Sequence, residues 1–262
     1  MVEASATGNA VLYEKRGPVA LITINQPQKR NALSASVREG LRSAFESFER
    51  DSLAKVAILT ATGEQAFCAG MDLKEASVSK LKIPPRGPGG VPVIGDDLVV
   101  TKPTIAAVNG VAVAGGWLIA QMCDLCVAAD HATFGITEAR VGRGTPWAVP
   151  LINMLPQRVV LELLMTGQLI SARRLYELGY VNRLAPLSSL MDEAMALALQ
   201  ISANAPLTVR ACREMVYLST EMGRSKAMKS ADDLFAPVYL SEDAQEGPKA
   251  FSEKRTPVWK GK

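Results

Sequence analysis

The order of strand-like and helix-like segments constrains the fold of this chain more than any other sequence feature. Residues 104–124 read TIAAVNGVAVAGGWLIAQMCD, in which a β-branched run and a small-residue turn with two adjacent glycines lead into a buried helix pattern. A similar apolar run, KVAILTAT, occupies residues 55–62, and LCVAAD and TFGI follow within residues 125–136. Strands that alternate with helices pack as layers of sheet and helix, so this order predicts an α/β core.

The segments on either side extend this prediction. Residues 10–25 alternate like two strands joined at RGP, which indicates a hairpin. Residues 34–51 are amphipathic, and Ser36 and Glu39 have the spacing of a capping box at the start of a helix. The segment MDLKEA has a helix-like pattern, whereas the proline and glycine residues of 80–97 indicate a mobile loop.

The C-terminal part is expected to be helical. Helices are predicted within TGQLISARRLYELGYVNRL, from Ser188 or Ser189 to about Ala203, and from Pro206 onward. We therefore divide the chain into a core domain over residues 1–200 and a C-terminal helical region over residues 201–262.

Composition narrows the range of partners. With 262 residues, 48% of them apolar, and a net charge of +3, the chain has the balance of a globular protein and too little positive charge to indicate nucleic-acid binding. It has no run of about 18 apolar residues that could span a membrane. The first residues, MVEASATGNA, lack the basic head and apolar stretch of a secretory signal. We expect a cytoplasmic protein that binds neither nucleic acid nor membrane.

The inventory of reactive side chains excludes several chemistries. His131 is the only histidine, and the sequence has no nucleophile elbow, Walker loop, G-x-G-x-x-G or H-E-x-x-H motif. Cys123 and Cys126 form CDLC without a second cysteine pair, so buried thiols are favoured over a zinc or redox site. Carboxylates and backbone amides remain as the groups that can do chemistry.

Two segments bring backbone N–H groups to the start of a helix. AFCAGMDL does so between Ala69 and Met71, and AVAGGWL does so at Gly115. Two converging N–H groups can hold an oxygen that becomes negative, and each contributes roughly 3 kcal/mol of transition-state stabilisation. Glycines at such positions can also serve only to let a helix pack closely on a strand. The occurrence of both motifs after successive strands favours an oxyanion hole.

Taken together, these motifs resemble those of the crotonase superfamily (enoyl-CoA hydratase/isomerase). The resemblance covers most of the chain and is carried by NQPQKRNALS, AFCAGMDL, NGVAVAGGWLIAQMCD, ATFGITEARVG, LMTGQLISARRLYELGYVNRL and AFSEKRTPVWKG. It implies a spiral of repeated ββα units with C-terminal helices that build a homotrimer, often paired into a hexamer. It also implies an acyl-CoA substrate, no metal or redox cofactor, and coenzyme A that enters only as part of the substrate.

The resemblance assigns roles to individual residues. Met71 and Gly115 fall on the two positions whose N–H groups hold the thioester oxygen. The coenzyme A site is implied at Lys29, Arg30, Ala32 and Leu33, at Ala69 and Asp72, and at Phe251 and Lys254.

The proton-transfer residues depart from those of the family's hydratases. Those enzymes carry one Glu on the first turn of the GG helix and another after F-G; here the first position is Leu118 and the second is Glu138. Adding water requires two coordinated proton transfers, whereas moving a double bond from β,γ to α,β requires one carboxylate that carries a proton between two carbons. The sequence therefore favours isomerisation with Glu138 as the base.

Other interpretations remain open at this point. The protein could be a hydratase that uses Glu138 with a substitute polar group, an acyl-CoA decarboxylase, or a crotonase-fold binding protein without catalysis. Glu138 could also be a surface carboxylate paired with Arg140 or Arg143. The segment GRGTPWAVP replaces the family's Pro-Gly-x-Gly-Gly run, so Trp147 could line the pocket or only pack.

Overall fold

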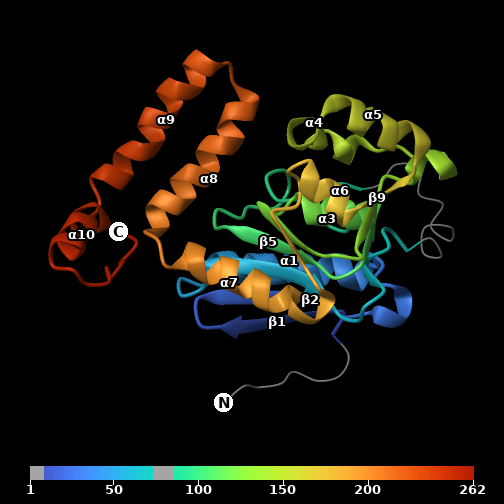
Figure 1. Ribbon diagram of the computed structural model, residues 1–262, viewed down its shortest axis with the longest axis horizontal. Coiled ribbons are helices and arrows are strands. Elements are labelled where there is room, and N and C mark those ends of the chain that lie inside the picture. Colours follow the sequence, from blue (N-terminus) through green and yellow to red (C-terminus); the bar gives the residue numbers. More distant parts are fainter. Residues whose placement is uncertain (1–8, 73–84) are drawn as a thin grey trace.

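The computed structural model describes residues 9–72 and 85–262 and places their strands in two sheets (Figure 1). The larger sheet has the order β1-β2-β3-β5-β7-β10 and the smaller has the order β4-β6-β8-β9. The strands are β1 Val11–Arg16, β2 Val19–Ile24, β3 Val56–Ala61, β4 Ala66–Cys68, β5 Thr104–Val108, β6 Val111–Val113, β7 Leu125–Ala129, β8 Thr133–Gly135, β9 Leu169–Ser171 and β10 Arg183–Ala185.

The chain builds these sheets by alternating between them. β3 lies in the larger sheet and β4 in the smaller, and the same holds for β5 and β6 and for β7 and β8. The helix α3 (Gly115–Gln121) directly follows β6 and completes one such unit. The expected spiral of ββα units is confirmed. Most of MDLKEA and the first part of the predicted loop over 80–97 lie outside the described residues.

The long strands lie where the sequence predicts them. β1 and β2 form the expected antiparallel hairpin, and Gly17 has a φ of 60° in its turn. From β2 onward the larger sheet is parallel, and every residue of β3 and β5 is buried. Such mostly apolar, fully buried segments are typical of strands covered on both faces.

The prediction of helix alone over TGQLISARRLYELGYVNRL is wrong. The segment contains β9 and β10, separated by the short helix α6 (Ala172–Glu177). β9 pairs antiparallel with β8, and β10 pairs parallel with β7. Each strand is three residues long, so its side chains give no full period of alternation, and it exists because a neighbouring strand supplies hydrogen-bond partners.

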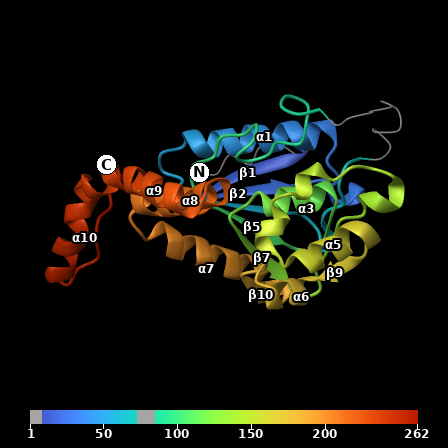
Figure 2. The same ribbon diagram turned by 90° about the horizontal axis from the view of Figure 1, so that it is seen from above.

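Helices cover both faces of the larger sheet. α1 (Ala35–Arg50) lies on one face and α7 (Leu190–Ser202) on the other (Figure 2). The predicted capping box at Ser36 is wrong: the N-cap is Ser34, whose hydroxyl lies 3.1 Å from the Ser36 hydroxyl instead of capping a backbone N–H. The N-cap of α7 is Ser189, as expected.

The remaining helices flank the smaller sheet or extend from the core. They are α4 Leu151–Met154, α5 Gln157–Thr166, α8 Pro206–Glu221, α9 Arg224–Tyr239 and α10 Glu242–Ser252, with the 3₁₀ turns η1 Pro27–Lys29, η2 Glu138–Val141, η3 Pro146–Ala148 and η4 Leu187–Ser189. No helix of residues 9–72 and 85–262 is long and apolar enough to cross a bilayer. The same residues contain no cluster of side chains suited to a metal ion.

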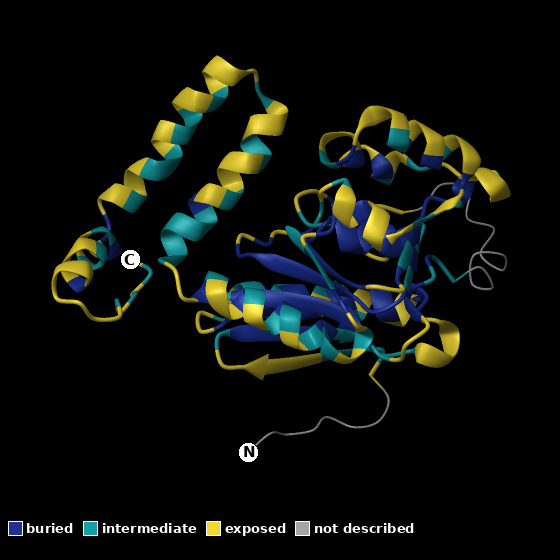
Figure 3. Cartoon of the chain, in the orientation of Figure 1, coloured by how far each residue is buried: buried dark blue, intermediate teal, exposed yellow. Residues whose placement is uncertain are grey.

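The helices α8 and α9 form an antiparallel arm that leaves the core, and α10 follows α9 on the side of the arm away from the core (Figure 1). α8 begins at Pro206, as predicted, and the arm is mostly exposed or half-buried (Figure 3). Asp124 ties the arm to the core: its Oδ1 accepts from Arg213 Nε and Tyr217 Oη, each at 2.7 Å, and its Oδ2 accepts from Thr104 N at 2.7 Å. Trimer formation through this arm stays a prediction.

Candidate active site

Three neighbouring strands of the smaller sheet bring the predicted catalytic residues together. β4, β6 and β8 are parallel neighbours, and the segments that follow their carboxyl ends carry Met71, Gly115 and Glu138 respectively. The carboxyl ends of parallel strands meet at one edge of a sheet, where ligand sites commonly form. Residues far apart in the sequence thus converge on one edge.

The backbones at Met71 and Gly115 lie side by side. Gly70 has a φ of 86°, and a Cβ placed on it would lie 3.5 Å from the Gly115 nitrogen. A Cβ placed on Gly115 would lie 3.8 Å from the Met71 nitrogen. Gly115 is the first residue of α3, where a helix offers no internal acceptor, and neither N–H donates a hydrogen bond to another described residue. Both N–H groups are therefore available to one external oxygen.

The turn before Gly115 is held in a strained conformation. Ala114 has φ 52° and ψ −124°, a region that costs a residue with a Cβ about 1–3 kcal/mol. Its carbonyl accepts from the N–H of Leu118 at 3.1 Å, and its own N–H donates to Gly135 O at 2.9 Å. These bonds to α3 and to the end of β8 hold the strained turn that places Gly115.

The two glycines of the GG motif have different roles. A Cβ on Gly116 would lie 2.1 Å from the carbonyl oxygen of Cys68, so only glycine lets α3 lie against β4. A Cβ on Gly115 would meet Leu33 Cδ1 at 2.8 Å. Gly116 thus permits close packing, while the N–H of Gly115 has no acceptor among the described residues, so the two interpretations of this motif do not exclude each other.

Glu138 is a buried carboxylate with one occupied oxygen. It is the first residue of η2 and is 8% exposed. Its Oε1 accepts a hydrogen bond from Trp147 Nε1 at 2.8 Å, and its Oε2 is buried without a hydrogen-bond partner among the described residues. Burial raises the pKa of the Glu138 carboxyl above its ordinary value, and the bond from Trp147 acts in the opposite direction. A raised pKa and an unpaired oxygen are typical of a carboxylate that exchanges protons.

The alternative interpretation of Glu138 as a surface carboxylate is therefore wrong. The charged residues near it in sequence, Arg140 and Arg143, do not shift its pKa. The Arg140 guanidinium instead donates to the Thr166 carbonyl at 3.4 Å.

The first turn of α3 carries no acid. Leu118 is buried, and none of the residues of α3 is ionisable. Trp117 is fully buried and packs edge-to-face against Phe134 and Tyr180, with ring centroids 5.4 Å and 5.7 Å away. Trp117 is thus a core residue.

The segment from Lys29 to Leu33, predicted to bind coenzyme A, is hydrogen-bonded to the segment from Ala69 to Met71, predicted to hold the thioester oxygen. Leu33 N donates to Gly70 O at 2.8 Å, and Ala69 N donates to Arg30 O at 3.0 Å. The structure therefore brings the residues predicted near the start of the chain against those that follow β4. They are Lys29, Arg30, Ala32 and Leu33 on one side and Ala69, Met71 and Asp72 on the other.

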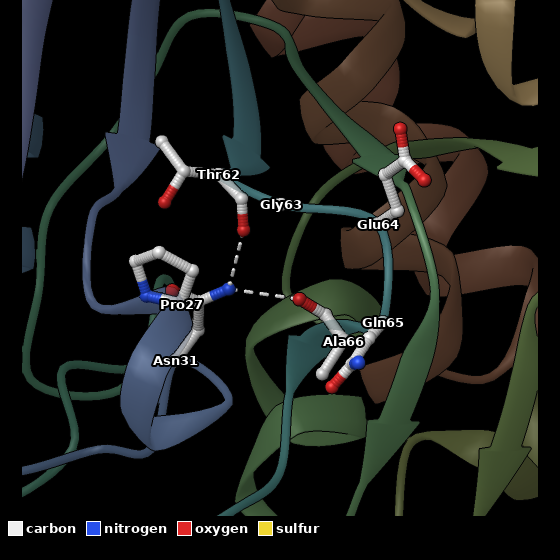
Figure 4. A pocket seen from close by; sticks show the side chains of 7 residues that line it. All are labelled: Pro27, Asn31, Thr62, Gly63, Glu64, Gln65 and Ala66. Atoms are coloured by element: carbon white, nitrogen blue, oxygen red, sulfur yellow. Dashed lines mark hydrogen bonds between the residues drawn. The ribbon is translucent and has the colours of Figure 1, made fainter.

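Asn31 shapes this segment, and the sequence analysis did not identify it. Its Nδ2 donates to Thr62 O at 3.0 Å and to Ala66 O at 2.8 Å (Figure 4), while its Oδ1 accepts from Gln26 N at 3.0 Å. Arg30 and Asn31 both have positive φ, at 51° and 54°. Asparagine tolerates this left-handed conformation, so the Asn in KRNALS was the available signal.

Phe251 and Lys254 lie apart from the other predicted site residues in one chain. Phe251 is on α10 and is 86% exposed. Both views separate α10 from α3 and β9 (Figures 1 and 2). A contribution of these two residues to a coenzyme A site therefore requires a second copy of the chain and stays a prediction.

Two cavities lie outside this site. One of about 390 Å³ is lined by Pro27, Asn31 and residues 62–66 (Figure 4). Another of about 600 Å³ lies between Asn109 and the segment at Leu187. Neither is lined by Met71, Gly115 or Glu138.

Similarity to known proteins agrees with this geometry. A model of the enoyl-CoA hydratase/isomerase family matches residues 14–262. The chain belongs to the enoyl-CoA hydratase/isomerase family. Its members are enzymes of the crotonase superfamily, and the mixed α/β fold expected from that resemblance is confirmed.

Relatives in this family are similar over nearly their full length. The chain is 38% identical to carnitinyl-CoA dehydratase of Citrobacter koseri, over 95% of this chain and 98% of the relative. It is 39% identical to that of Salmonella paratyphi B, over 95% and 97%. Among solved structures, an enoyl-CoA hydratase of Mycobacterium tuberculosis has a TM-score of 0.90 at 38% identity, covering 97% of this chain and 100% of its own. A probable enoyl-CoA hydratase/isomerase of Mycobacterium abscessus has a TM-score of 0.88 at 39% identity, covering 98% and 100%.

Proposed function

We propose that this enzyme processes an acyl-CoA thioester through an enolate and that it favours moving a double bond from the β,γ to the α,β position. The N–H groups of Met71 and Gly115 hold the thioester oxygen, and Glu138 carries the proton. The observation that supports this proposal is the pairing of one buried carboxylate, whose Oε2 has no partner, with a helix α3 that contributes no second acid.

The proposed reaction needs one base. Glu138 Oε2 takes a proton from the α-carbon of a β,γ-enoyl thioester, and the electron pair of that C–H bond delocalises onto the carbonyl oxygen. The oxyanion is stabilised by the two backbone donors. Glu138 then returns the proton to the γ-carbon, which yields the conjugated α,β-enoyl thioester and restores the carboxylate.

Binding of the coenzyme A portion is proposed at the segment from Lys29 to Leu33, which faces the strand end at Ala69. Basic side chains there suit an anionic ligand. Phe251 and Lys254 of a second copy would complete the site in a trimer or hexamer. No separate cofactor is needed for this chemistry, and coenzyme A arrives as part of the substrate.

A second candidate is hydration or dehydration of an acyl-CoA. It is favoured by the relatives named carnitinyl-CoA dehydratase, which are 38–39% identical to this chain. In that case a polar group other than residue 118 must activate the water, because Leu118 is apolar and buried.

A panel of β,γ- and α,β-enoyl-CoA thioesters analysed by chromatography and mass spectrometry separates the two candidates. Isomerisation changes retention without changing mass, whereas hydration adds the mass of one water. We expect Glu138→Gln to lose about a hundredfold to ten-thousandfold in kcat while still binding acyl-CoA, because it removes the proton carrier. Glu162→Gln is the matched control, because that carboxylate is exposed on α5. Rapid hydration of a trans-2-enoyl-CoA by the wild type would overturn the preference for isomerisation.

A further inference from the structure

We propose that Trp147 is a positioning residue for Glu138: its indole N–H fixes Oε1 so that Oε2 alone exchanges the proton, and Gln121 holds Trp147 in place. This inference rests on the proposed role of Glu138. It concerns a segment, GRGTPWAVP, in which this chain departs from the Pro-Gly-x-Gly-Gly run of the hydratases that it resembles.

The contacts form a chain from α3 to the carboxylate. Gln121, on the last turn of α3, donates from Nε2 to the Trp147 carbonyl at 2.5 Å. Trp147, on η3, donates from Nε1 to Glu138 Oε1 at 2.8 Å. Gln121 is 5% exposed, and its Oε1 has no partner among the described residues. The bond from its Nε2 to the Trp147 carbonyl is therefore the hydrogen bond that its buried amide makes. The helix that positions the oxyanion donor therefore also fixes the base.

The donor type suits this role. An indole N–H donates one hydrogen bond, accepts none and does not titrate in the working range, so it cannot compete for the proton that Glu138 carries. A hydrogen bond to a charged acceptor is about twice as strong as a neutral one, and it favours the ionised carboxylate that acts as the base. It also fixes the plane of the carboxyl group and thereby the direction of Oε2.

In the described part of the chain, no charged side chain is a source of the pKa shift of Glu138. The charged residues on η2 and on the helix packed against it are Arg140 on η2, Arg143 just beyond it, and Arg158 and Glu162 on α5. The pKa of Glu138 responds to burial and to hydrogen bonds from Trp147 and the local backbone, and not to any charged group in the described part of the chain. Loss of the indole N–H would remove the side-chain hydrogen bond that opposes the effect of burial on this pKa.

Nuclear magnetic resonance of the indole groups tests the inference without any substrate. The chain has three tryptophans, so the ¹⁵N-indole spectrum has three signals, each assigned by its Trp→Phe variant. We expect the Trp147 signal to shift with pH as Glu138 ionises, and this shift to disappear in Glu138→Gln. The Trp259 signal is the internal control, because its Nε1 donates to the Ala203 carbonyl at 2.7 Å. A Trp147 signal that is insensitive to pH, or that titrates equally in Glu138→Gln, would overturn the proposal.

Kinetics test the consequence. Replacing Trp147 by benzothienylalanine keeps the ring shape and removes the donor, which should move the acid limb of the kcat profile to higher pH by about one to two pH units with little change in KM. The variant Gln121→Met should move the limb in the same direction by a smaller amount, and Trp259→Phe should leave it in place. An unchanged limb in the benzothienylalanine enzyme refutes the inference. If the indole signal titrates but no acyl-CoA is turned over, the proposed function fails while the Trp147–Glu138 interaction stands.

Discussion

Replacing Gly116 by alanine is expected to displace one half of the oxyanion hole. The new Cβ would lie 2.1 Å from the Cys68 oxygen and 2.8 Å from the Cys68 carbonyl carbon, whereas side-chain contacts of this kind are essentially never below 3.0 Å. Both Cys68 atoms belong to the backbone of β4, so no rotamer can relieve the contact. The start of α3 must therefore move away from β4 by about 0.9 Å, the difference between 2.1 Å and 3.0 Å.

This displacement acts on catalysis because Gly115 precedes Gly116 in the chain. The Gly115 N–H moves with the helix, while the Met71 N–H stays with β4, so the two donors no longer converge on one oxygen. A misplacement of about 1 Å can reduce a rate about a hundredfold, and overpacking typically costs about 1–3 kcal/mol of stability. We expect kcat to fall by about that factor while the protein still folds.

The assay compares kcat, KM and the thermal midpoint of Gly116→Ala with those of the wild type. Gly223→Ala is the matched control: its Cβ meets nothing within 4 Å, and Gly223 lies in the arm before α9. A Gly116→Ala enzyme with wild-type kcat and thermal midpoint would refute the reasoning. An equal loss in Gly223→Ala would show that the effect does not come from the contact between α3 and β4.

Three further predictions follow from single side chains. The folded-state pKa of Glu138 is raised, so its contribution to the free energy of unfolding is fully present below the ordinary carboxyl pKa and is lost as pH rises through the raised value. Glu138→Gln should therefore be more stable than the wild type at neutral pH. Urea unfolding at a series of pH values measures this difference. Leu118→Glu should raise the ratio of hydrated to isomerised product and lower the thermal midpoint, because it buries a second carboxylate; a ratio equal to that of the wild type would contradict the one-carboxylate argument. Asp124→Ala removes the partner of the mostly buried Arg213 and should cost roughly 3–5 kcal/mol, with loss of the expected trimer in sedimentation; an unchanged assembly would separate the arm's attachment from oligomerisation.

The sequence by itself determines the longer elements and the chemical character of the site. Strands β2, β3, β5 and β7 are mostly apolar segments of five or six residues, long enough to be recognised from the local sequence. The sequence also shows directly the residues of the predicted site: the glycine motifs at Gly70 and Gly115, the acid Glu138 and the apolar Leu118. Together they predict a backbone oxyanion hole served by one carboxylate.

Only the tertiary structure decides the elements and contacts that depend on distant partners. The three-residue strands β4, β6, β9 and β10 carry too little pattern to be recognised and form because adjacent strands offer backbone partners. The order of β4, β6 and β8 in one sheet is what places three strand ends at one edge.

The same dependence on distant partners explains what the sequence left open at the site. Trp147 could line a pocket or only pack, and the fold packs it against the core with its Nε1 2.8 Å from Glu138 Oε1. The sequence alone does not distinguish Asn31 from other polar loop residues. Its role depends on the fold, which brings its amide to the carbonyls of Thr62 and Ala66. Phe251 lies on α10, which both views separate from α3 (Figures 1 and 2). The local sequence determines which functional groups are present, and long-range packing determines which of them come into contact. The reason is that side-chain hydrogen bonds between loops depend on the relative positions of both loops, which neither loop's sequence specifies alone.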